Sequence, residues 1–268
     1  MDGKRVYECI REILKTDLGD YPEIQNICIR SIGPEGELYA EPGEIADKIY
    51  NADAKKQLPP SVANFLIEYY TDEIEAGDYD AACDLGSLCY SGRIGRKDYK
   101  QAVEYYTLAA DNGCRQAQEN LGYCYYYGRD VAVDYEKAFH YFALGAFDGH
   151  LRSLYKIGDM YRNGYYVKKD PREAFYIYNR CVETMTDEAI PEVGADVFMR
   201  MGDCFSQAIG VDADLQIALM FYQRAEQLFY KRLKEGDYMI KGCYDHSVKA
   251  QEEIRKKLQG ELPGYDWV

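Results

Sequence analysis

The sequence has 268 residues, of which 47% are hydrophobic, 14% aromatic and 29% charged. Its 46 carboxylates outnumber its 32 lysines and arginines, giving a formal net charge of -14. This charge would repel phosphate groups and so argues against nucleic acid or an anionic membrane surface as the main partner. It is compatible with basic proteins or peptides, although solubility alone would also explain it.

Targeting signals and cysteine content indicate the cellular compartment that we expect for the protein. No segment approaches the roughly 18 apolar residues that a membrane-spanning helix needs, and the first twenty residues lack the apolar core of a signal peptide. We therefore expect a cytoplasmic location. The nine cysteines are odd in number and include no C-x-x-C pair. We interpret them as small residues of a packed core rather than as disulfide partners.

The N-terminal segment, residues 1–42, is the part that the sequence describes least. Apolar residues between Val6 and Leu14 recur at helical spacing. The stretch IQNICIRSI at 24–32 fits either a short strand or a helix, and a loop follows it. The segment is thus expected to be a helical cap or a small mixed element.

A degenerate repeat is expected at residues 43–77. The stretch EYYTDEIEAG at 68–77 matches EYYTLAADNG at 104–113, which lies in a clearer repeat. Residues 61–77 are therefore predicted to form the second helix of a hairpin. Residues 43–55 are the candidate for its first helix.

Four further segments repeat one pattern. Each begins with an apolar residue followed by glycine, and the beginnings are 36, 36 and 44 residues apart. The four pairs are Leu85-Gly86, Leu121-Gly122, Ile157-Gly158 and Met201-Gly202. An alanine follows sixteen residues after each glycine, at Ala102, Ala138, Ala174 and Ala218. The glycine and alanine columns indicate two helices that approach closely, where a larger side chain would cost about 1–3 kcal/mol.

Each repeat reads as a helical hairpin. The first helix ends near Gly92, Gly128 or Gly164, with Ala208 in the fourth copy. An aspartate precedes each second helix by the spacing of an N-cap, where its carboxylate accepts bonds from free backbone amides. These aspartates are Asp98, Asp134, Asp170 and Asp214.

The combined pattern, LG-xx-Y, then G, then V-xx-D-xx-KA-xx-YY-xx-AA-xx-G, resembles the Sel1-like repeat, a relative of the tetratricopeptide repeat. The resemblance implies an all-α solenoid, a superhelix of stacked antiparallel helical hairpins. It places the repeats at about 78–113, 114–149, 150–194 and 195–235. Residues 236–268 would form a capping helix and tail.

The search for chemistry finds no catalytic constellation. No phosphate-binding loop, H-E-x-x-H motif or nucleophile elbow is present, and the three histidines lack partners at metal-ligand spacing. Cys89, Cys124, Cys181 and Cys204 fall in columns that are apolar or small in the other copies. We therefore predict no catalytic residue, no metal and no cofactor.

The resemblance instead implies a non-enzymatic scaffold that binds a protein or peptide along a concave surface lined by the first helix of each repeat. The columns expected there vary in chemistry between copies, as a binding surface requires and as solvent exposure equally permits. The candidate residues are Asp84, Ser87, Glu119, Asn120, Tyr123, Tyr126, Tyr127, Tyr155, Lys156, Asp159, Arg162, Asn163, Arg200 and Asp203. Among them Tyr123, Tyr126 and Tyr127 share one helical face and form a three-tyrosine patch.

Two other hypotheses stay open at this point. Some cysteine-rich Sel1-like proteins are associated with penicillin binding or hydrolysis, which would make the chain a β-lactamase-like hydrolase, although it lacks their cysteine spacing. A purely structural or oligomer-forming role is the third reading. The sequence leaves the oligomeric state and the partner's identity open.

Overall fold

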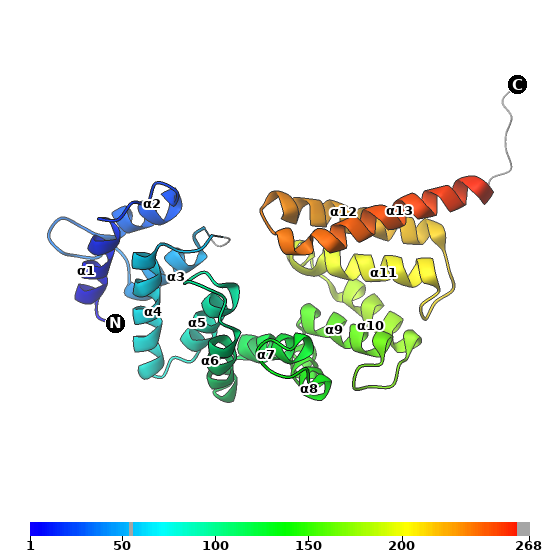
Figure 1. Ribbon diagram of the computed structural model, residues 1–268, viewed down its shortest axis with the longest axis horizontal. Coiled ribbons are helices and arrows are strands. Elements are labelled where there is room, and N and C mark those ends of the chain that lie inside the picture. The colour runs from blue at the N-terminus through cyan, green and yellow to red at the C-terminus, as the bar shows by residue number, and fades with distance from the viewer. Residues whose placement is uncertain (54–55, 262–268) are drawn as a thin grey trace, which may run out of the picture. The chain divides into compact units, whose positions relative to one another are not determined.

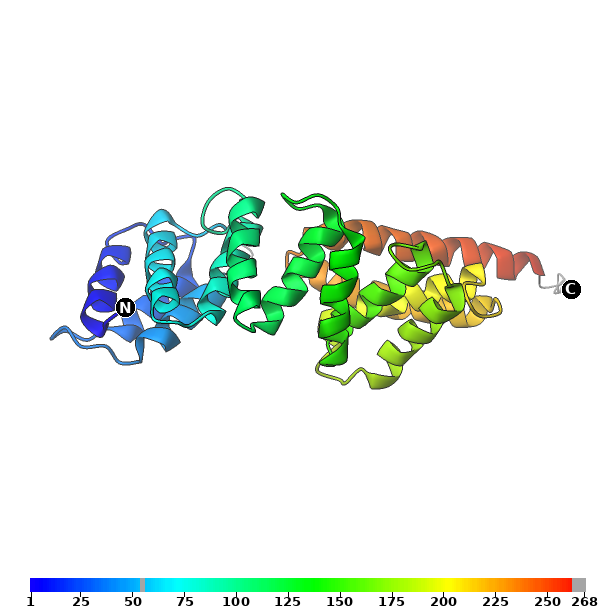
Figure 2. The same cartoon turned by 90° about the horizontal axis from the view of Figure 1, so that it is seen from below.

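The computed structural model describes residues 1–53 and 56–261, and Figures 1 and 2 show it from two sides. The described residues form thirteen α-helices packed in consecutive pairs, are 72% helical and contain no strand. The all-α prediction is confirmed. None of the described helices is both long and apolar enough to cross a bilayer.

The chain divides into two compact units, Met1–Asp134 and Tyr135–Val268. The division falls inside the second predicted repeat, 114–149, between its two helices. We describe each unit by itself.

The N-terminal unit contains seven helices. They are α1 (Gly3–Ile13), α2 (Pro22–Ser31), α3 (Pro42–Asn51), α4 (Pro60–Glu75), α5 (Asp80–Ser91), α6 (Tyr99–Asp111) and α7 (Arg115–Tyr127). The stretch that fitted either a strand or a helix thus lies mostly in α2. Residues 54–55, the end of the expected first helix of the degenerate repeat, lie outside the described residues.

The core of this unit begins in the N-terminal segment and continues into the repeats. Val6 and Ile10 of α1, Ile24 of α2, Ile45 of α3 and Leu66 of α4 are all fully buried in one cluster. The α1 helix packs on α4, and α2 packs on α3. The N-terminal segment therefore covers the degenerate repeat, since its apolar face completes that core.

The C-terminal unit contains the other helices. They are α8 (Tyr135–Phe147), α9 (Leu151–Asn163), α10 (Pro171–Thr184), the π-helix η1 (Ile190–Gly194), α11 (Ala195–Gln207), α12 (Leu215–Lys234), the 3-10 helix η2 (Tyr238–Ile240) and α13 (Lys241–Glu261). The eight-residue lengthening before the fourth repeat contributes η1. The predicted capping helix corresponds to α13, and the predicted tail at 262–268 lies outside the described residues.

The predicted helix caps are present wherever their bonds are described. The Asp98 side chain accepts from the Gln101 amide at 2.9 Å. Asp170 accepts from the amides of Arg172 and Glu173, and Asp214 from those of Gln216 and Ile217. The first helices end in left-handed residues, and Ala208 has a φ of 56° where the other repeats have glycine.

The repeated glycines are explained by a more specific contact than the expected approach of two helix backbones. A Cβ on Gly158 would lie 2.6 Å from the Tyr178 ring of the second helix, and one on Gly202 would lie 2.8 Å from Tyr222. Gly86 meets Tyr106 in the same way, at 2.8 Å. Each glycine therefore makes room for the tyrosine that lies twenty residues later.

Candidate functional site

The tyrosines that pack on the glycines also bond to the first helix of their own hairpin. The Tyr178 hydroxyl donates to Asp159 at 2.8 Å, and the Tyr222 hydroxyl donates to Asp203 at 2.7 Å. In the first repeat the Tyr106 hydroxyl donates to Ser87 at 3.2 Å. In each of these repeats the hydroxyl thus meets the residue that follows the glycine.

The Asp159 carboxylate is also held by the first helix of the next repeat. Arg200 of α11 donates through Nε to Oδ1 at 2.5 Å and through Nη2 to Oδ2 at 2.7 Å. The guanidinium lies over the Tyr155 ring, 4.5 Å from its centroid. Burial alone would raise the pKa of Asp159, but the Arg200 charge and hydrogen bonds hold that pKa below its usual range.

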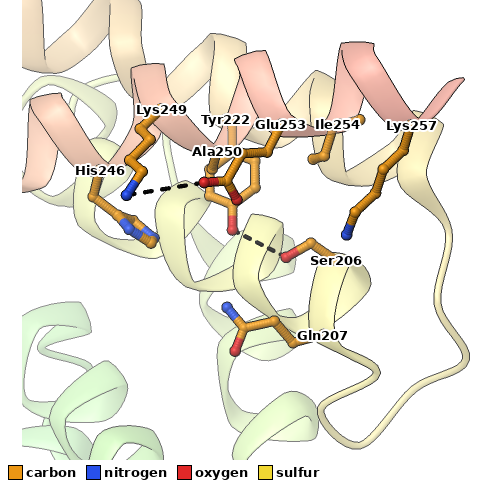
Figure 3. A pocket seen from close by; sticks show the side chains of 9 residues that line it. All are labelled: Ser206, Gln207, Tyr222, His246, Lys249, Ala250, Glu253, Ile254 and Lys257. Carbon is orange, nitrogen blue, oxygen red and sulfur yellow. Dashed lines mark hydrogen bonds and ion pairs between the residues drawn. The ribbon is translucent and has the colours of Figure 1, made fainter. Parts of the chain in front are cut away.

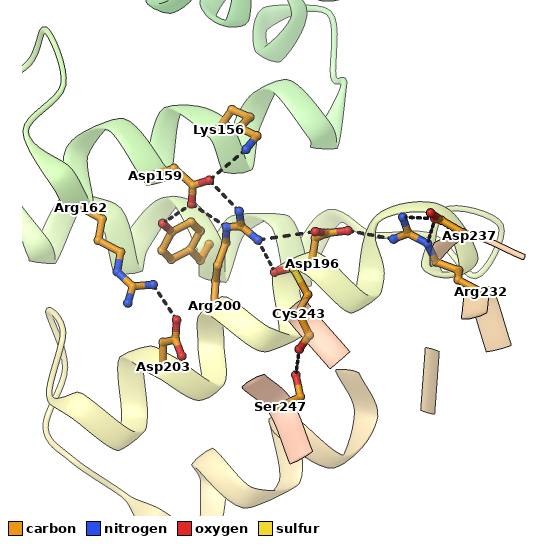
Figure 4. Close-up of polar contacts among 11 residues, drawn as sticks. Lys156, Asp159, Arg162, Asp196, Arg200, Asp203, Arg232, Asp237, Cys243 and Ser247 are labelled. Carbon is orange, nitrogen blue, oxygen red and sulfur yellow. Dashed lines mark hydrogen bonds and ion pairs between the residues drawn. The ribbon is translucent and has the colours of Figure 1, made fainter. Parts of the chain in front are cut away.

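The ion pair belongs to a chain of alternating charges, drawn in Figure 4. Lys156 lies 3.4 Å from Asp159 on one side. On the other side Arg200 is 3.8 Å from Asp196, and Arg232 joins Asp196 to Asp237 at 3.0 and 2.8 Å. Three cations and three carboxylates thus link α9, α11, α12 and the turn after α12. Such a chain can be buried because each charge has an opposite neighbour.

A second carboxylate, Asp203, repeats the arrangement one repeat later, on α11. It accepts from Arg162 of α9 at 2.8 Å and from His246 of α13 at 2.8 Å. The hydrogen bond with Asp203 raises the pKa of His246 above its ordinary value. Burial opposes the ionisation of Asp203, but the bonds from His246, Arg162 and Tyr222 keep its pKa low.

The three-tyrosine patch lies on α7 of the N-terminal unit. The rings of Tyr123 and Tyr127 are stacked with centroids 6.3 Å apart, and Tyr126 meets Tyr127 edge-on at 4.9 Å. The Arg129 guanidinium lies 5.7 Å from the Tyr127 ring and 5.2 Å from the Tyr99 ring. Tyr127 is 47% exposed, while Tyr123 and Tyr126 are half-buried.

Two further candidates lie on α7 and α5 of this unit. The Asn120 side chain of α7 donates to the Cys83 sulfur of α5 at 3.7 Å. Asp84, next to Cys83, is half-buried, and its pKa is raised to about 6. Burial is the largest cause, followed by the charges of Asp47, Asp80 and Asp78.

The repeat pattern and the geometry agree with the comparisons to known proteins. The Sel1 repeat family matches residues 80–114, 115–150, 151–180 and 199–228. The chain is a Sel1-like repeat protein.

Two solved structures share the fold of this Sel1-like repeat protein. The Sel1 repeat protein from Oxalobacter formigenes is 22% identical with a TM-score of 0.55, over 84% of this chain and 93% of that one. A protective antigen of uropathogenic Escherichia coli with a Sel1-like repeat fold is 18% identical with a TM-score of 0.53, over 80% of this chain and 46% of that one. No curated protein matches the chain. Both likenesses show the α/α solenoid fold.

The structure separates the candidate residues into two groups. In the C-terminal unit Tyr155, Lys156, Asp159 and Asp203 are each less than 10% exposed. The expectation of an exposed concave surface therefore differs from the structure here. Arg200 covers the Tyr155 ring and pairs with Asp159, while Arg162 and His246 pair with Asp203. Arg162 and Arg200 are half-buried in the same ion pairs, and Asn163 is exposed but bonds back to the Asp159 carbonyl.

In the N-terminal unit the candidates are more open. Glu119 is buried at 4% exposure. Asp84, Ser87, Asn120, Tyr123 and Tyr126 are half-buried, and Tyr127 is exposed. Of the predicted surface residues on α5 and α7, Tyr127 is therefore the most exposed.

A small pocket lies between α11 and α13 of the C-terminal unit (Figure 3). Its volume is about 230 Å³. Ser206 and Gln207 line one side, and His246, Lys249, Glu253 and Lys257 line the other. The Tyr222 hydroxyl bonds to Ser206 at 3.1 Å, and Lys249 is 3.9 Å from Glu253, so the polar groups at the pocket's edge contact one another.

The cysteines of this Sel1-like repeat protein are packing residues. Cys89, Cys124, Cys181 and Cys204 are free thiols with at most 2% exposure. Burial raises the pKa of Cys124, Cys181 and Cys204 to about 12, and that of Cys89 to about 11. Thiols held this firmly in the protonated form are poor nucleophiles.

Sequence reasoning missed the role of His246. It lies 43 residues after Asp203, whereas Arg200 lies 41 residues after Asp159. The 41-residue spacing of Asp159 and Arg200, applied to Asp203, would select Tyr244 and not His246. The repeat register therefore gave no signal for the His246–Asp203 bond.

Proposed function

We propose that this Sel1-like repeat protein is a non-enzymatic scaffold that binds a protein segment on the first helices α5 and α7 of its N-terminal unit. Sel1 repeats generally serve as protein-interaction scaffolds. The net charge of -14 favours a basic segment.

The observation that carries the proposal is the patch of Tyr123, Tyr126 and Tyr127 on α7. Tyrosine and arginine are over-represented among residues that dominate binding energy, and here Arg129 lies against the exposed Tyr127 ring. The stacked rings also restrict one another, which lowers the entropy lost when a partner orders them.

The contrast between the units supports the same choice. In the C-terminal unit the residue after the repeated glycine is Asp159 or Asp203. Both carboxylates form ion pairs with residues of other repeats. In the second repeat that column holds Tyr123, whose half-buried ring stacks on the exposed Tyr127. The repeats of the C-terminal unit thus use these columns for cohesion, and α7 presents them for binding.

Photo-cross-linking tests the proposal. A benzophenone amino acid replaces Tyr127 in one variant and Tyr176 of α10 in a second; these two tyrosines are 47% and 56% exposed. In cells that produce the protein, we expect a discrete cross-linked partner from position 127 and not from position 176. The purified partner should then bind Tyr127→Ser at least ~10-fold more weakly than Tyr176→Ser. Equal products from both positions, or equal affinities, would contradict the proposal.

A further inference from the structure

Three polar residues of the N-terminal unit act on one another electrostatically where the degenerate repeat meets the first clear repeat. They are Asp47 of α3, Tyr70 of α4 and Asp84 of α5. Tyr70 is 3% exposed, and its hydroxyl has no hydrogen-bond partner among the described residues. A buried hydroxyl without a partner is costly, and it therefore indicates a site that another group completes.

The repeat register identifies the kind of group that is missing. Tyr70 corresponds to Tyr106 through the shared E-Y-Y-T stretch, and Tyr106 corresponds to Tyr178. In their own hairpins Tyr106 donates to Ser87 and Tyr178 to Asp159. The hydroxyl of Tyr70 holds the same place in its hairpin, and the charges of Asp84 and Asp47 are among those that act on it.

The residue before the apolar–glycine pair is charged both in the first repeat and in the fourth. Asp84 precedes Leu85 as Arg200 precedes Met201. Arg200 reaches back to a carboxylate on the preceding first helix, Asp159 of α9. The first helix that precedes Asp84 is α3, and its charge that acts most strongly on Asp84 is again a carboxylate, that of Asp47. Where the C-terminal unit has a guanidinium facing a carboxylate, the N-terminal unit has two carboxylates.

Two described cations of this region, Arg93 and Lys48, have hydrogen-bond or ion-pair partners other than Asp47 and Asp84. The Arg93 guanidinium donates to the carbonyls of Tyr50 and Ala52. Lys48 of α3 pairs with Glu44 at 2.6 Å. Two carboxylates that repel each other, here the exposed Asp47 and the half-buried Asp84, are stabilised by a cation that bridges them.

We propose that Asp47, Asp84 and Tyr70 bind an arginine side chain of the protein segment that the scaffold recognises. The guanidinium bridges the two carboxylates, and one of its N–H groups donates to the Tyr70 hydroxyl oxygen. This inference rests on the proposed function, because it names the chemistry of the bound segment.

Arginine fits better than the other cations. No group of three metal-ligating side chains occurs among the described residues, so a metal ion would lack protein ligands here. The planar guanidinium presents several donors to two separate carboxylates, whereas lysine offers a single point charge. Asp47 is exposed and Asp84 half-buried, so an arginine can enter from solvent.

The test is an NMR titration of the full chain labelled with ¹³C at the aspartate carboxyls. The probe is N-acetyl-arginine amide, and N-acetyl-citrulline amide is its neutral match. We expect a saturable shift of the Asp84 and Asp47 signals with the arginine probe only, accompanied by a fall in the Asp84 titration midpoint. Asp47→Asn and Asp84→Asn should each weaken binding at least ~10-fold, and Tyr70→Phe several-fold. Asp111→Asn removes one exposed charge of the same unit, at the end of α6 and outside the site, and should leave the affinity within about two-fold.

The inference is overturned if citrulline shifts the signals as strongly as arginine does, if Mg²⁺ but not arginine does so, or if no saturable shift occurs. Its failure differs from failure of the proposed function. If the Tyr127 cross-link still captures its partner while the arginine probe does not bind, the scaffold stands and the arginine site falls. If arginine binds but position 127 captures nothing specific, the site stands and the scaffold assignment falls.

Discussion

Arg200 of α11 holds Asp159 of α9 through two hydrogen bonds of 2.5 and 2.7 Å, across the boundary between successive repeats. The same carboxylate accepts from Tyr178 of its own repeat. One aspartate therefore ties a hairpin internally and joins it to the next. Cohesion of the C-terminal unit depends on this polar connection as well as on its apolar core.

Arg200→Ala should be strongly destabilising. The Asp159 side chain is 10% exposed, and the loss of its guanidinium leaves most of a buried charge uncompensated. We expect the free energy of unfolding of the C-terminal unit to fall by about 3–5 kcal/mol, measured by urea denaturation with circular dichroism. Arg5→Ala is the matched control, since Arg5 forms a similar two-bond pair with Glu68 at the surface. If both variants lose equal stability, the buried pair does not hold the repeats together.

The helix register could be predicted from the sequence because its signals are local. An aspartate before each second helix, a small residue sixteen positions after each glycine, and a left-handed residue at each turn all lie within one repeat. The Asp159–Arg200 pair could not, because it joins residues 41 positions apart in columns whose residue types differ between repeats. Charged side chains are rarely buried unless paired, so the same residues read equally well as an exposed surface.

Gly158→Ala should destabilise the third hairpin. Its Cβ would lie 2.6 Å from the Tyr178 ring, which is itself fully buried and bonded to Asp159. We expect a loss of about 1–3 kcal/mol in the free energy of unfolding. Gly242→Ala is the control, because nothing lies within 4 Å of its added Cβ. That exposed helical position should gain up to about 1 kcal/mol, and a loss at both positions would refute the packing explanation.

Ala208→Gly should be stabilising. Ala208 ends α11 with a φ of 56°, a conformation that costs an L-residue about 1–2 kcal/mol and glycine almost nothing. After the greater chain entropy of unfolded glycine is subtracted, a net gain of roughly 0.5–1 kcal/mol remains. Thermal denaturation should show a higher midpoint for Ala208→Gly and a lower one for the reverse change, Gly164→Ala. A lower midpoint for Ala208→Gly would show that the Ala208 methyl is held by contacts worth more than the strain.

The His246–Asp203 bond predicts a pH dependence of the C-terminal cap. The folded-state pKa of His246 is raised, so its contribution to stability is complete below the unfolded pKa and is lost as the pH rises through the folded one. Asp203→Asn should move the NMR titration midpoint of His246 back down. Glu252→Gln, an exposed charge on the same helix, should leave it unchanged. A midpoint insensitive to Asp203→Asn would show that the bond does not set the pKa.

Several groups around His246 raise or lower its pKa. The Asp203 hydrogen bond and charge raise its pKa, as does the more distant Glu253, while burial and the Arg162 charge lower it. Tyr222 donates to the same Asp203 oxygen. The upward shift therefore depends chiefly on one carboxylate.

Asp84→Asn should stabilise the N-terminal unit at neutral pH. The pKa of Asp84 rises from 3.8 to about 6, so its contribution is present at low pH and is lost as the pH rises between these values. The neutral amide should therefore gain about 1–2 kcal/mol near neutral pH and little near pH 4, by urea denaturation at both. Asp111→Asn, on the exposed end of α6, should gain nothing. An Asp84→Asn gain that does not depend on pH would contradict the assignment.

The groups around Asp84 either raise its pKa or have their own pKa well above neutrality. The groups that interact with it are Asp47, Asp78, Asp80, Tyr50, Tyr70 and Cys83. The charges of the other three carboxylates raise the pKa of Asp84, and burial raises the pKa of both tyrosines and of the thiol well above neutrality. A bound guanidinium would reverse the effect and lower the Asp84 pKa.

We infer that the partner binds on α5 and α7. Hydrogen–deuterium exchange of the full chain, with and without the partner captured at position 127, tests it most directly. When the partner is bound, we expect slower exchange in peptides from 80–91 and 115–127. Peptides from the second helices at 99–111 and 171–184 should show no change. Protection confined to the second helices, or absent from 80–91 and 115–127, would contradict it.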